Sequence, residues 1–390
     1  MSVINETDLL IIGAGPFGLA IAAQAAHAGI NHLIVGKPME FWRKHMPKGM
    51  YLRSACDWHL DAQNEHTIER FLETQGKTSH DVEPLSLDFY LSYVDWFQQQ
   101  KKIQPRAVHI QRLDHSSTTN HFVATTVDGD TIHARRVVLA PGFKHFTNIA
   151  DELKSRLPAG RFLHTCEFTD FSESAGRRYL IIGGRQSAYE WAALLIEAGA
   201  ATVHLSHRHA SPTFEEADWS WVNTAVDNMV ENPNWFRNLS QAEKDAIAQR
   251  LWAEGRLKLE PWLGPRVQNE RVHVWPHTEV SSYREQENGE LAVELTNGET
   301  VVVDQIILAT GYKVNIANLP VLASGNILPL LKTRNGFPEL DDHFETSVPG
   351  LFITSMPAGQ DFGPFFGFTV AVRASARLIG KAVEQRTHPR

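Results

Sequence analysis

Residues 8–36 read DLLIIGAGPFGLAIAAQAAHAGINHLIVG, and the fold is decided by this stretch. The apolar run at 9–12 is typical of a parallel strand that is covered on both faces. Gly13 permits a tight turn, Gly15 lets the backbone approach a pyrophosphate, and Gly18 lets the helix pack close to the strand. An Ala-rich helix, a glycine stop and a second apolar run follow, so the stretch predicts a βαβ unit that binds a dinucleotide.

The same pattern occurs a second time along the chain. Residues 178–206 read RYLIIGGRQSAYEWAALLIEAGAATVHLS, in which Gly183 matches Gly13 and Gly199 matches Gly29. A hairpin signal follows each copy, with Asp-Gly at 128–129 and Asn-Gly at 297–298. Each hairpin leads into a strand that ends in Ala-x-Gly, at 140–142 and at 309–311.

This internal repeat predicts an α/β protein with two Rossmann-like dinucleotide-binding domains. We expect the first domain at 1–155 and 312–390, and the second at 156–311. A small helical insertion is expected within the second domain at 210–276, where five tryptophans occur between 219 and 262. Ser240 and Glu243 form a capping box at the start of one of its helices.

Composition restricts the class of protein. The chain has 390 residues, a formal net charge of -8 and no long basic run, so nucleic acid and anionic membranes are not expected partners. Cys56 and Cys166 are the only cysteines, which fits a reducing cytoplasm and excludes a redox CxxC. The N-terminus has no basic signal-peptide region, and no apolar stretch approaches the roughly 20 residues of a membrane span.

These motifs resemble the two-dinucleotide-binding-domain flavoproteins, and more closely the flavin-containing and N-hydroxylating monooxygenases. GAGPFG at 13–18 is similar to their FAD turn, and GGRQSA at 183–188 to their NADPH turn GxGQSA. LATGY at 308–312 matches their strand end, and FWRKHMPKGMYLRS at 41–54 resembles the loop beside the flavin. GLFITSMPAGQDFGPFFGFTVAVRASA, near the C-terminus, looks like their last strand and helix.

The resemblance implies FAD in the first domain and NADPH in the second. It implies that NADPH reduces FAD by hydride transfer, and that O2 is then activated as a flavin C4a-peroxide. One oxygen would pass to a small substrate at nitrogen, sulfur or a carbonyl. No metal site is expected, because the histidines and cysteines lack metal-binding spacing. The aromatic insertion is also suited to a homodimer interface.

The expected cofactor-binding residues follow from the same motifs. They are Gly13, Gly15, Pro16, Phe17, Gly18, Lys37, Trp42, Arg43, Met50, Leu52, Val108, Ala140, Gly142, His164, Gly183, Gly184, Arg185, Gln186, Ser187, Ala188, Arg208, Ala309, Thr310, Gly311, Asp361, Phe362 and Gly363. Arg208 follows the second strand of the second repeat, where a cation fits the 2′-phosphate of NADPH and an acid would favour NADH. A solvated surface arginine is the alternative interpretation of Arg208.

Two positions depart from the family pattern. Gly36 stands where an acid usually holds the adenosine ribose of FAD. Ribose binding is then left to the backbone, to Lys37, or to Glu40 and Arg43. Arg185 occupies the third position of the second turn, where glycine is usual, so its side chain must turn outward or donate to a phosphate.

Candidate catalytic residues lie in two aromatic-rich loops, at 51–64 and 358–368. They are Arg53, His59, Asp61 and Gln360. Polar groups among aromatic side chains are typical of an enclosed site, although each one is also explained by an ion pair or a satisfied core position. Two other functions remain open: an FAD-dependent NADPH reductase that does not activate oxygen, and a non-catalytic dinucleotide-binding or sensor protein.

Overall fold

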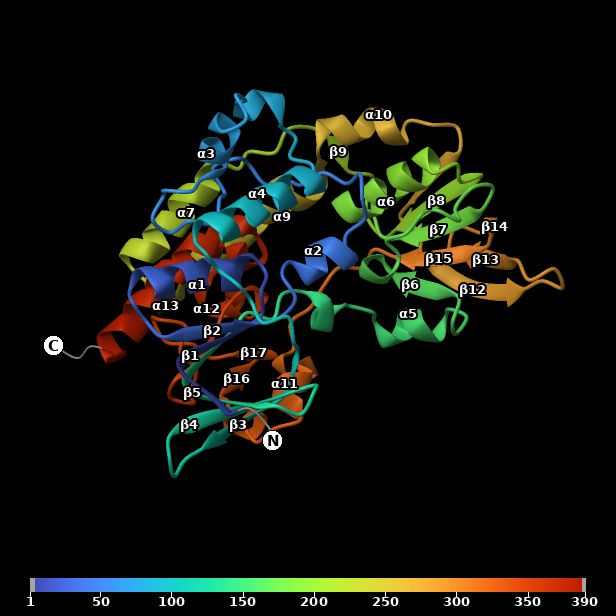
Figure 1. Ribbon diagram of the computed structural model, residues 1–390. Coiled ribbons are helices and arrows are strands. Elements are labelled where there is room, and N and C mark those ends of the chain that lie inside the picture. The colour runs from blue at the N-terminus through green and yellow to red at the C-terminus, as the bar shows by residue number, and fades with distance from the viewer. Residues whose placement is uncertain (1–3, 388–390) are drawn as a thin grey trace.

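The computed structural model describes residues 4–387, which form two lobes lying side by side (Figure 1). The strands of the first lobe are β1 (Ile4–Ile12), β2 (His32–Val35), β3 (Ile110–Ser116), β4 (His121–Thr126), β5 (Thr131–Leu139) and β18 (Leu351–Ile353). They form one sheet in the order β2-β1-β5-β4-β3, with β18 paired to the C-terminal part of β5. The pairs β1–β2, β1–β5 and β5–β18 are parallel, whereas β3, β4 and β5 pair antiparallel.

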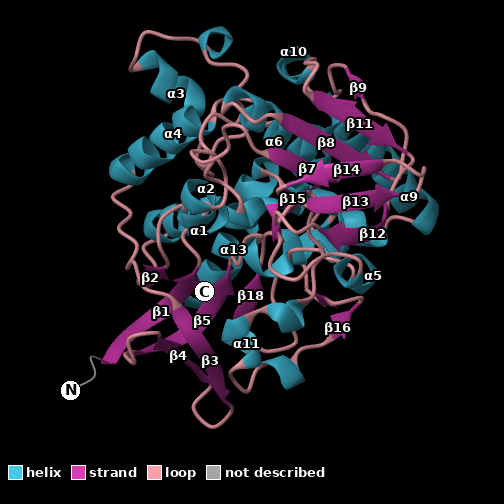
Figure 2. Cartoon of the chain, turned by 90° about the vertical axis from the view of Figure 1, so that its right-hand side faces the viewer, coloured by secondary structure: helices cyan, strands magenta, loops and turns pink. Residues whose placement is uncertain are grey.

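The second lobe contains a parallel sheet and a smaller antiparallel sheet. The parallel sheet has the order β11-β8-β7-β15-β6 and consists of β6 (Phe162–His164), β7 (Arg178–Ile182), β8 (Thr202–His207), β11 (Val272–Pro276) and β15 (Gln305–Leu308). The antiparallel sheet consists of β12 (Val280–Glu285), β13 (Leu291–Leu295) and β14 (Thr300–Val303). Figure 2 shows loops and short helices between the two lobes.

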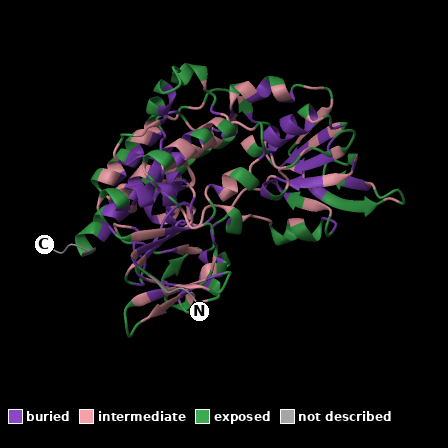
Figure 3. Ribbon diagram, viewed as in Figure 1, coloured by how far each residue is buried: buried purple, intermediate pink, exposed green. Residues whose placement is uncertain are grey.

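Helices flank both sheets. In the first lobe they are α1 (Pro16–His27), α2 (Glu40–Lys44), α3 (Ile68–Glu73), α4 (Leu87–Gln100), α11 (Pro320–Ala323), α12 (Gly359–Phe362) and α13 (Val372–Thr387). In the second lobe they are α5 (Asp151–Ser155), α6 (Gln186–Glu197) and α10 (Gly264–Val267). Helix α1 packs against α13. The buried residues gather on the sheets and on the helices that cover them (Figure 3). No helix in the described part of the chain has the length and apolar character to cross a membrane.

The predicted fold class is confirmed. The two repeats form the units β1–α1–β2 and β7–α6–β8, each with parallel strands in register. The Asp-Gly and Asn-Gly turns connect β4 to β5 and β13 to β14, both antiparallel. The division into an FAD domain and an NADPH domain at the expected boundaries remains a prediction.

The tryptophan-rich segment differs from the expectation in two respects. Its helices are α7 (Ser220–Glu231), α8 (Trp235–Asn238) and α9 (Gln241–Trp252), and α9 runs into a π-helical turn, Ala253–Leu257. A short pair, β9 (Thr213–Phe214) with β10 (Lys258–Leu259), closes this segment. The insertion expected at 210–276 therefore ends before β11. This strand belongs to the parallel sheet, because its backbone pairs with β8. In addition, α7 packs against α13, and Val222 and Met229 join the core of the first lobe.

The chain passes from the first lobe to the second at 146–148 and returns at 311–313, and these two segments are hydrogen-bonded to each other. Asn148 N donates to Gly311 O at 2.9 Å, and Lys313 N donates to Phe146 O at 2.7 Å. Thr147 and Tyr312 form an antiparallel bridge between these bonds. The two crossings thus form one short two-stranded ribbon.

Candidate active site

A cavity of about 880 Å³ is lined by residues of both lobes. Gly15 and Phe17 line it from the first glycine turn, and Gln186, Ser187 and Trp191 line it from the start of α6. The two predicted nucleotide-binding turns therefore face the same space. This is the arrangement that brings the reactive ends of two dinucleotides together.

Many of the predicted site residues line this cavity. They are Gly13, Gly15, Pro16, Phe17, Lys37, Trp42, Met50, Leu52, Arg53, Val108, Ala140, Gly142, Gln186 and Ser187. The predicted loop beside the flavin also contributes Phe41, Tyr51 and Ser54. These residues come from segments that are far apart in sequence, and the fold brings the segments together around one cavity.

The first glycine turn has the shape that a pyrophosphate requires. A Cβ on Gly13, where φ is 114°, would lie 2.2 Å from Ala140 O, and a Cβ on Gly18 would lie 1.8 Å from Gly13 O. Both glycines allow close packing of backbone against backbone, so Gly18 serves the turn without lining the cavity. Gly15, in contrast, has nothing within 4 Å of an added Cβ. The backbone there is open to a ligand, so the turn fits a dinucleotide.

The second turn repeats this packing. A Cβ on Gly183 would lie 2.5 Å from Ala309 O, as Gly13 does against Ala140, while a Cβ on Gly184 would meet the His207 ring at 2.4 Å. Ala188 is fully buried where the helix meets the strand. These residues shape the turn without lining the cavity.

Arg185 turns away from the turn that it belongs to. Its Nη1 donates to Arg256 O at 2.7 Å, and its guanidinium carbon lies 4.4 Å from the centre of the Trp252 ring. The side chain is therefore held by the tryptophan-rich segment. Of the two alternatives that the sequence left open for Arg185, the structure has the outward orientation.

Gly36 has no room for the acid that usually stands at its position. Its φ is 131°, and an added Cβ would lie 3.0 Å from Ala14 N. A carboxylate is nevertheless present nearby, because Glu40 also lines the cavity. Glu40 Oε2 lies 3.0 Å from His109 Nε2, and Glu40 Oε1 lies 3.2 Å from Lys44 Nζ. Burial opposes ionisation of Glu40, but Lys44 and His109 outweigh it and lower its pKa.

Two other arginines predicted to bind a cofactor lie outside the cavity, next to acidic side chains. Arg43 Nη2 pairs with Asp95 Oδ1 at 2.6 Å. The side chain of Arg208 is 82% exposed, with Glu279 at 3.8 Å. Neither lines the cavity, so the predicted roles of Arg43 and Arg208 in cofactor binding remain predictions.

His164 contacts the end of the strand that leads to Ala309–Gly311. His164 Nε2 lies 3.1 Å from Gly311 O, and its Nδ1 lies 3.2 Å from Cys166 Sγ. Burial lowers the pKa of His164. Its neighbours Thr165 and Tyr312 line the cavity, whereas His164, Ala309, Thr310 and Gly311 do not. A satisfied core histidine describes His164 best.

The predicted residues of the 358–368 loop contact residues of the 334–344 segment and not the cavity. Asp361 accepts from Leu340 N at 2.8 Å and from Arg334 Nη2 at 3.0 Å. Phe362 stacks on Phe344 with ring centres 3.8 Å apart. Gln360 Oε1 accepts from Asn335 at 3.2 Å, and an added Cβ on Gly363 would meet Phe236 at 3.1 Å. None of these four predicted residues lines the cavity, because the turn is directed at the 333–344 hairpin.

His59 faces a different and smaller cavity, of about 340 Å³. It is 4% exposed, and Arg373 Nη1 lies 3.1 Å from its Nε2. Burial and the charge of Arg373 lower the pKa of His59 to about 3, so the imidazole is neutral at physiological pH. Its predicted catalytic role is not supported by a position at the main cavity.

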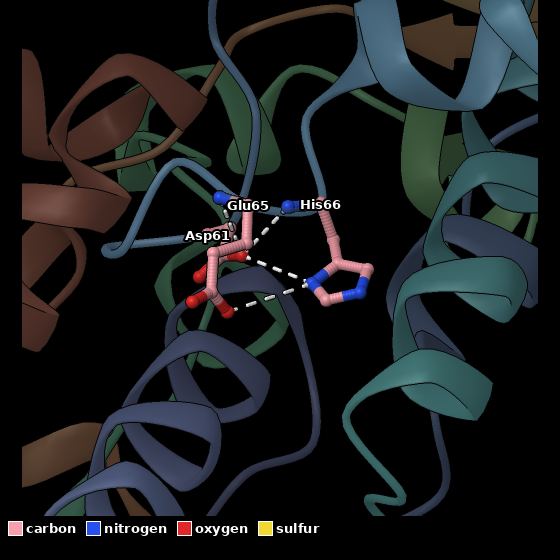
Figure 4. A group of neighbouring side chains, drawn as sticks. All are labelled: Asp61, Glu65 and His66. Atoms are coloured by element: carbon pink, nitrogen blue, oxygen red, sulfur yellow. Dashed lines mark hydrogen bonds and ion pairs between the residues drawn. The ribbon is translucent and has the colours of Figure 1, made fainter.

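Asp61 organises its own loop. Its carboxylate accepts backbone N–H bonds from Gln63, Glu65 and His66, and Lys101 Nζ lies 3.0 Å from Oδ2. Burial opposes ionisation, but these bonds outweigh it and lower the pKa of Asp61. Figure 4 shows Asp61, Glu65 and His66 converging. This group has the ligand types of a metal site, but the Lys101 ammonium already supplies its positive charge, 2.8 Å from Glu65 Oε2.

Several cavity residues are not among the individual residues predicted for the site. At the entry to α13 these are Gly367, Phe368 and Thr369, and Thr369 Oγ1 donates to Ser54 Oγ at 3.0 Å. Gly367 and Phe368 end the predicted 358–368 loop and Thr369 follows it, so the loop reaches the cavity through its C-terminal end and not through Gln360. Ser355, with φ of 66°, and Arg256 also line the cavity and carried no motif.

Comparisons with known proteins agree with this geometry. The model of the family described as pyridine nucleotide-disulphide oxidoreductase matches residues 10–250, more than half of the chain, and a second model with the same description matches residues 247–354. The probable indole-3-pyruvate monooxygenase YUCCA9 of Arabidopsis thaliana is 23% identical over 85% of this chain and 79% of its own length.

Solved structures share the fold. The ornithine N-hydroxylase KtzI of Kutzneria sp. 744, in a complex with reduced FAD, NADP+ and L-ornithine, gives a TM-score of 0.79 at 14% identity, over 98% of this chain and 100% of that chain. The bacillithiol disulfide reductase Bdr (YpdA) of Staphylococcus aureus gives a TM-score of 0.68 at 19% identity, with the same coverage. The predicted cofactors, FAD and NADPH, agree with the groups in the first of these complexes.

Proposed function

The chain belongs to the pyridine nucleotide-disulphide oxidoreductase family, and from this premise we propose that it is an FAD-dependent, NADPH-consuming monooxygenase. The observation that carries the proposal is the single cavity reached by both glycine turns, through Gly15 on one side and Gln186 on the other. Hydride transfer requires the two cofactors to meet without intervening water, and a shared cavity permits this. Family membership also removes the non-catalytic alternative, because the family consists of oxidoreductases.

The residues that would hold FAD are those of the first lobe. The turn from Gly13 to Phe17 would cradle the pyrophosphate, and Glu40 would accept from the ribose hydroxyls. Met50 and Leu52 would pack beside the ring system. When bound, the flavin supplies hydride acceptance and oxygen activation. The chain itself contributes orientation and the exclusion of water.

The cavity wall is suited to excluding water. Phe41, Phe143, Tyr312 and Phe368 line it, and the rings of Phe41, Phe143 and Tyr312 contact one another edge to face or tilted. An apolar wall of this kind disfavours hydrolytic and proton-leak reactions at a reactive centre. It therefore supports a reaction in which activated oxygen is transferred to an organic substrate and is not released as H2O2.

The substrate that we propose is a small soft nucleophile, with an amine favoured over a sulfide or a carbonyl. The likeness to the ornithine N-hydroxylase and the shared Gln186-Ser187-Ala188 sequence support an amine. The similarity to the YUCCA9 protein supports a carbonyl. The cavity, of about 880 Å³, extends from the first glycine turn to Gln186 and Arg256, so a second ligand would enter it from the end opposite the FAD ribose.

The alternative function is an NADPH reductase that does not activate oxygen. The likeness to the bacillithiol disulfide reductase favours it. Against a thiol mechanism, Cys56 and Cys166 are both buried, and burial raises the pKa of each thiol. A reductase of this chain would therefore act on a substrate other than a disulfide.

The two functions are distinguished by the fate of oxygen. The purified holoenzyme is mixed with NADPH and O2, with and without L-ornithine, putrescine or methyl phenyl sulfide. NADPH consumption, H2O2 and oxygenated product are then measured together. A monooxygenase forms product in near-stoichiometric amount with one of these substrates. NADPH oxidation that yields only H2O2 with all of them, and is fast with a quinone, would favour the reductase.

A further inference from the structure

The π-helical turn Ala253–Leu257 is held in place by two arginines, Arg53 from the cavity wall and Arg185 from the second glycine turn. Arg53 donates to the carbonyls of Gly255 at 2.8 Å, Lys258 at 3.2 Å and Glu254 at 3.4 Å. Arg185 donates to Arg256 O at 2.7 Å. Gly255 is also confined, since an added Cβ would lie 2.9 Å from the Trp219 ring. The backbone of Arg256 is thereby fixed at the cavity edge.

The side chain of Arg256, unlike that of Arg53, has no counter-charge among the described residues. Among the described residues no hydrogen bond or ion pair is formed by its guanidinium, although it lines the cavity. Arg53 pairs with Glu260 at 2.6 Å, and Lys37 lies 3.9 Å from Glu40. Arg256 is exposed to solvent at the cavity edge, and desolvation by the surrounding protein together with repulsion from Arg53 lowers its pKa. An anion at this position would therefore be stabilised.

The charges of the residues that line the cavity also favour the binding of an anion. Glu40 is the only carboxylate among the described lining residues, whereas Lys37, Arg53, Lys144 and Arg256 are cationic. Glu40 lies next to Gly36 and His109, at the end of the cavity where the FAD ribose is expected. The end formed by Gln186 and Arg256 has an unopposed positive charge.

Gln186 provides a second unsatisfied donor at this end. Its Oε1 accepts from Glu260 N at 3.3 Å, which fixes the amide so that Nε2 faces away from that bond. Gln186 Nε2 is closed to solvent and has no partner among the described residues. Such a donor is usually paired in a folded protein, so a ligand with acceptor oxygens is expected next to it.

We propose that Arg256 binds an oxyanion, a carboxylate or a phosphate, of the molecule that shares this cavity with the flavin. The guanidinium is suited to such groups because it offers a planar pair of donors. The proposal rests on the proposed function and adds the substrate class to it. The oxyanion comes from one of two sources, the phosphates of the nicotinamide dinucleotide or the carboxylate of an amino-acid substrate.

The test compares Arg256→Gln and Arg256→Lys with the wild-type holoenzyme. The probes are NADP+ and the pair L-ornithine and putrescine, which differ only in the carboxylate. Binding is followed by flavin fluorescence and calorimetry. Arg284→Gln serves as the control, since Arg284 is an exposed arginine of β12 outside the cavity. Thermal unfolding of each variant establishes that it is folded.

A phosphate source predicts that Arg256→Gln raises the Kd of NADP+ at least ~10-fold, with partial recovery in Arg256→Lys. A carboxylate source predicts an unchanged Kd for NADP+ and an increase of at least ~10-fold in the Kd of L-ornithine, with that of putrescine unchanged. Folded Arg256→Gln that binds NADP+ and L-ornithine as the control does would overturn the inference alone. A wild-type holoenzyme that binds neither probe would overturn the inference and the proposed function together.

Discussion

Arg53 and Glu260 form an ion pair, with 2.6 Å between Nε and Oε1, that joins the loop beside the flavin site to the tryptophan-rich segment. The two side chains are only 14% and 17% exposed. The same guanidinium donates to three backbone carbonyls, and Glu260 N in turn donates to Gln186. One arginine therefore connects both nucleotide-binding lobes to the turn between them.

Replacement of Arg53 should loosen this connection. Arg53→Ala leaves Glu260 and three carbonyls without their partner, so we expect a loss of roughly 2–4 kcal/mol in the free energy of unfolding. The π-helical turn should also become mobile, which would admit water and raise the fraction of NADPH consumed as H2O2. Denaturant unfolding and H2O2 assays measure both effects. A double-mutant cycle with Glu260→Gln would show no coupling if the pair were unimportant.

Glu40 should contribute to FAD affinity through the ribose. With no side chain possible at Gly36, Glu40 is the carboxylate nearest to that position in the cavity wall. Glu40→Gln should raise the Kd of FAD about 10-fold and leave the Kd of FMN, which lacks the adenosine, unchanged. Fluorescence titration of the apoprotein measures both constants. Glu73→Gln is the control, because Glu73 pairs with Arg70 on an exposed helix. Equal effects on FAD and FMN would contradict the assignment.

Glu190 should make stability depend on pH. It is 1% exposed, and burial raises its pKa to about 7, against the opposing effect of Arg266 at 3.0 Å. The folded protein then holds a proton that the unfolded chain releases near pH 4.5. The resulting stabilisation is complete below that pH and is lost as the pH rises through about 7. Its size is of order 3 kcal/mol.

The variant Glu190→Gln checks this directly. The amide keeps an acceptor for Tyr51 N and Arg266 and cannot ionise, so the fall in unfolding free energy between pH 5.5 and 8.5 should shrink. Glu197→Gln is the matched control, since Glu197 pairs with the same arginine and is 49% exposed. Parallel pH profiles for the wild type and Glu190→Gln would exclude this role for Glu190.

Arg208 should influence the choice between NADPH and NADH. Its exposed side chain lies beyond the end of β8, where the 2′-phosphate of a bound dinucleotide is expected. Arg208→Gln should raise the KM for NADPH about 10-fold with little change in the KM for NADH. Steady-state kinetics with both coenzymes give the ratio. An unchanged ratio would indicate that Arg208 is a solvated surface residue.

The features that the sequence predicted correctly are the glycine turns and the hairpins, which depend on the conformation of the backbone. Gly13 and Gly183 could be assigned because only glycine tolerates their approach to Ala140 O and Ala309 O, and the paired turns recur with the same spacing. The hairpins followed from Asp-Gly and Asn-Gly for the same reason. Such constraints are local, so a single sequence reveals them.

The predicted side chains that lie away from the main cavity are bound by distant partners. Asp361 and Gln360 looked like site residues because they stand among phenylalanines near the last helix, yet Leu340 N and Asn335 bind them. Asp61 and His59 are likewise satisfied within their own loop and by α13. No spacing rule connects these pairs, so only the folded chain shows which polar groups remain free.

The ribbon that joins the lobes gives their relative motion a direction. Asn148–Gly311 and Lys313–Phe146 form its two hydrogen bonds, and a ribbon so narrow twists and bends more readily than it stretches. The Arg53–Glu260 pair and the tryptophan-rich segment also join the lobes, so a rotation about this ribbon has to carry them with it. Glu260 in turn binds Gln186 at the edge of the cavity, and we therefore expect a rotation of the lobes to be felt first at that edge.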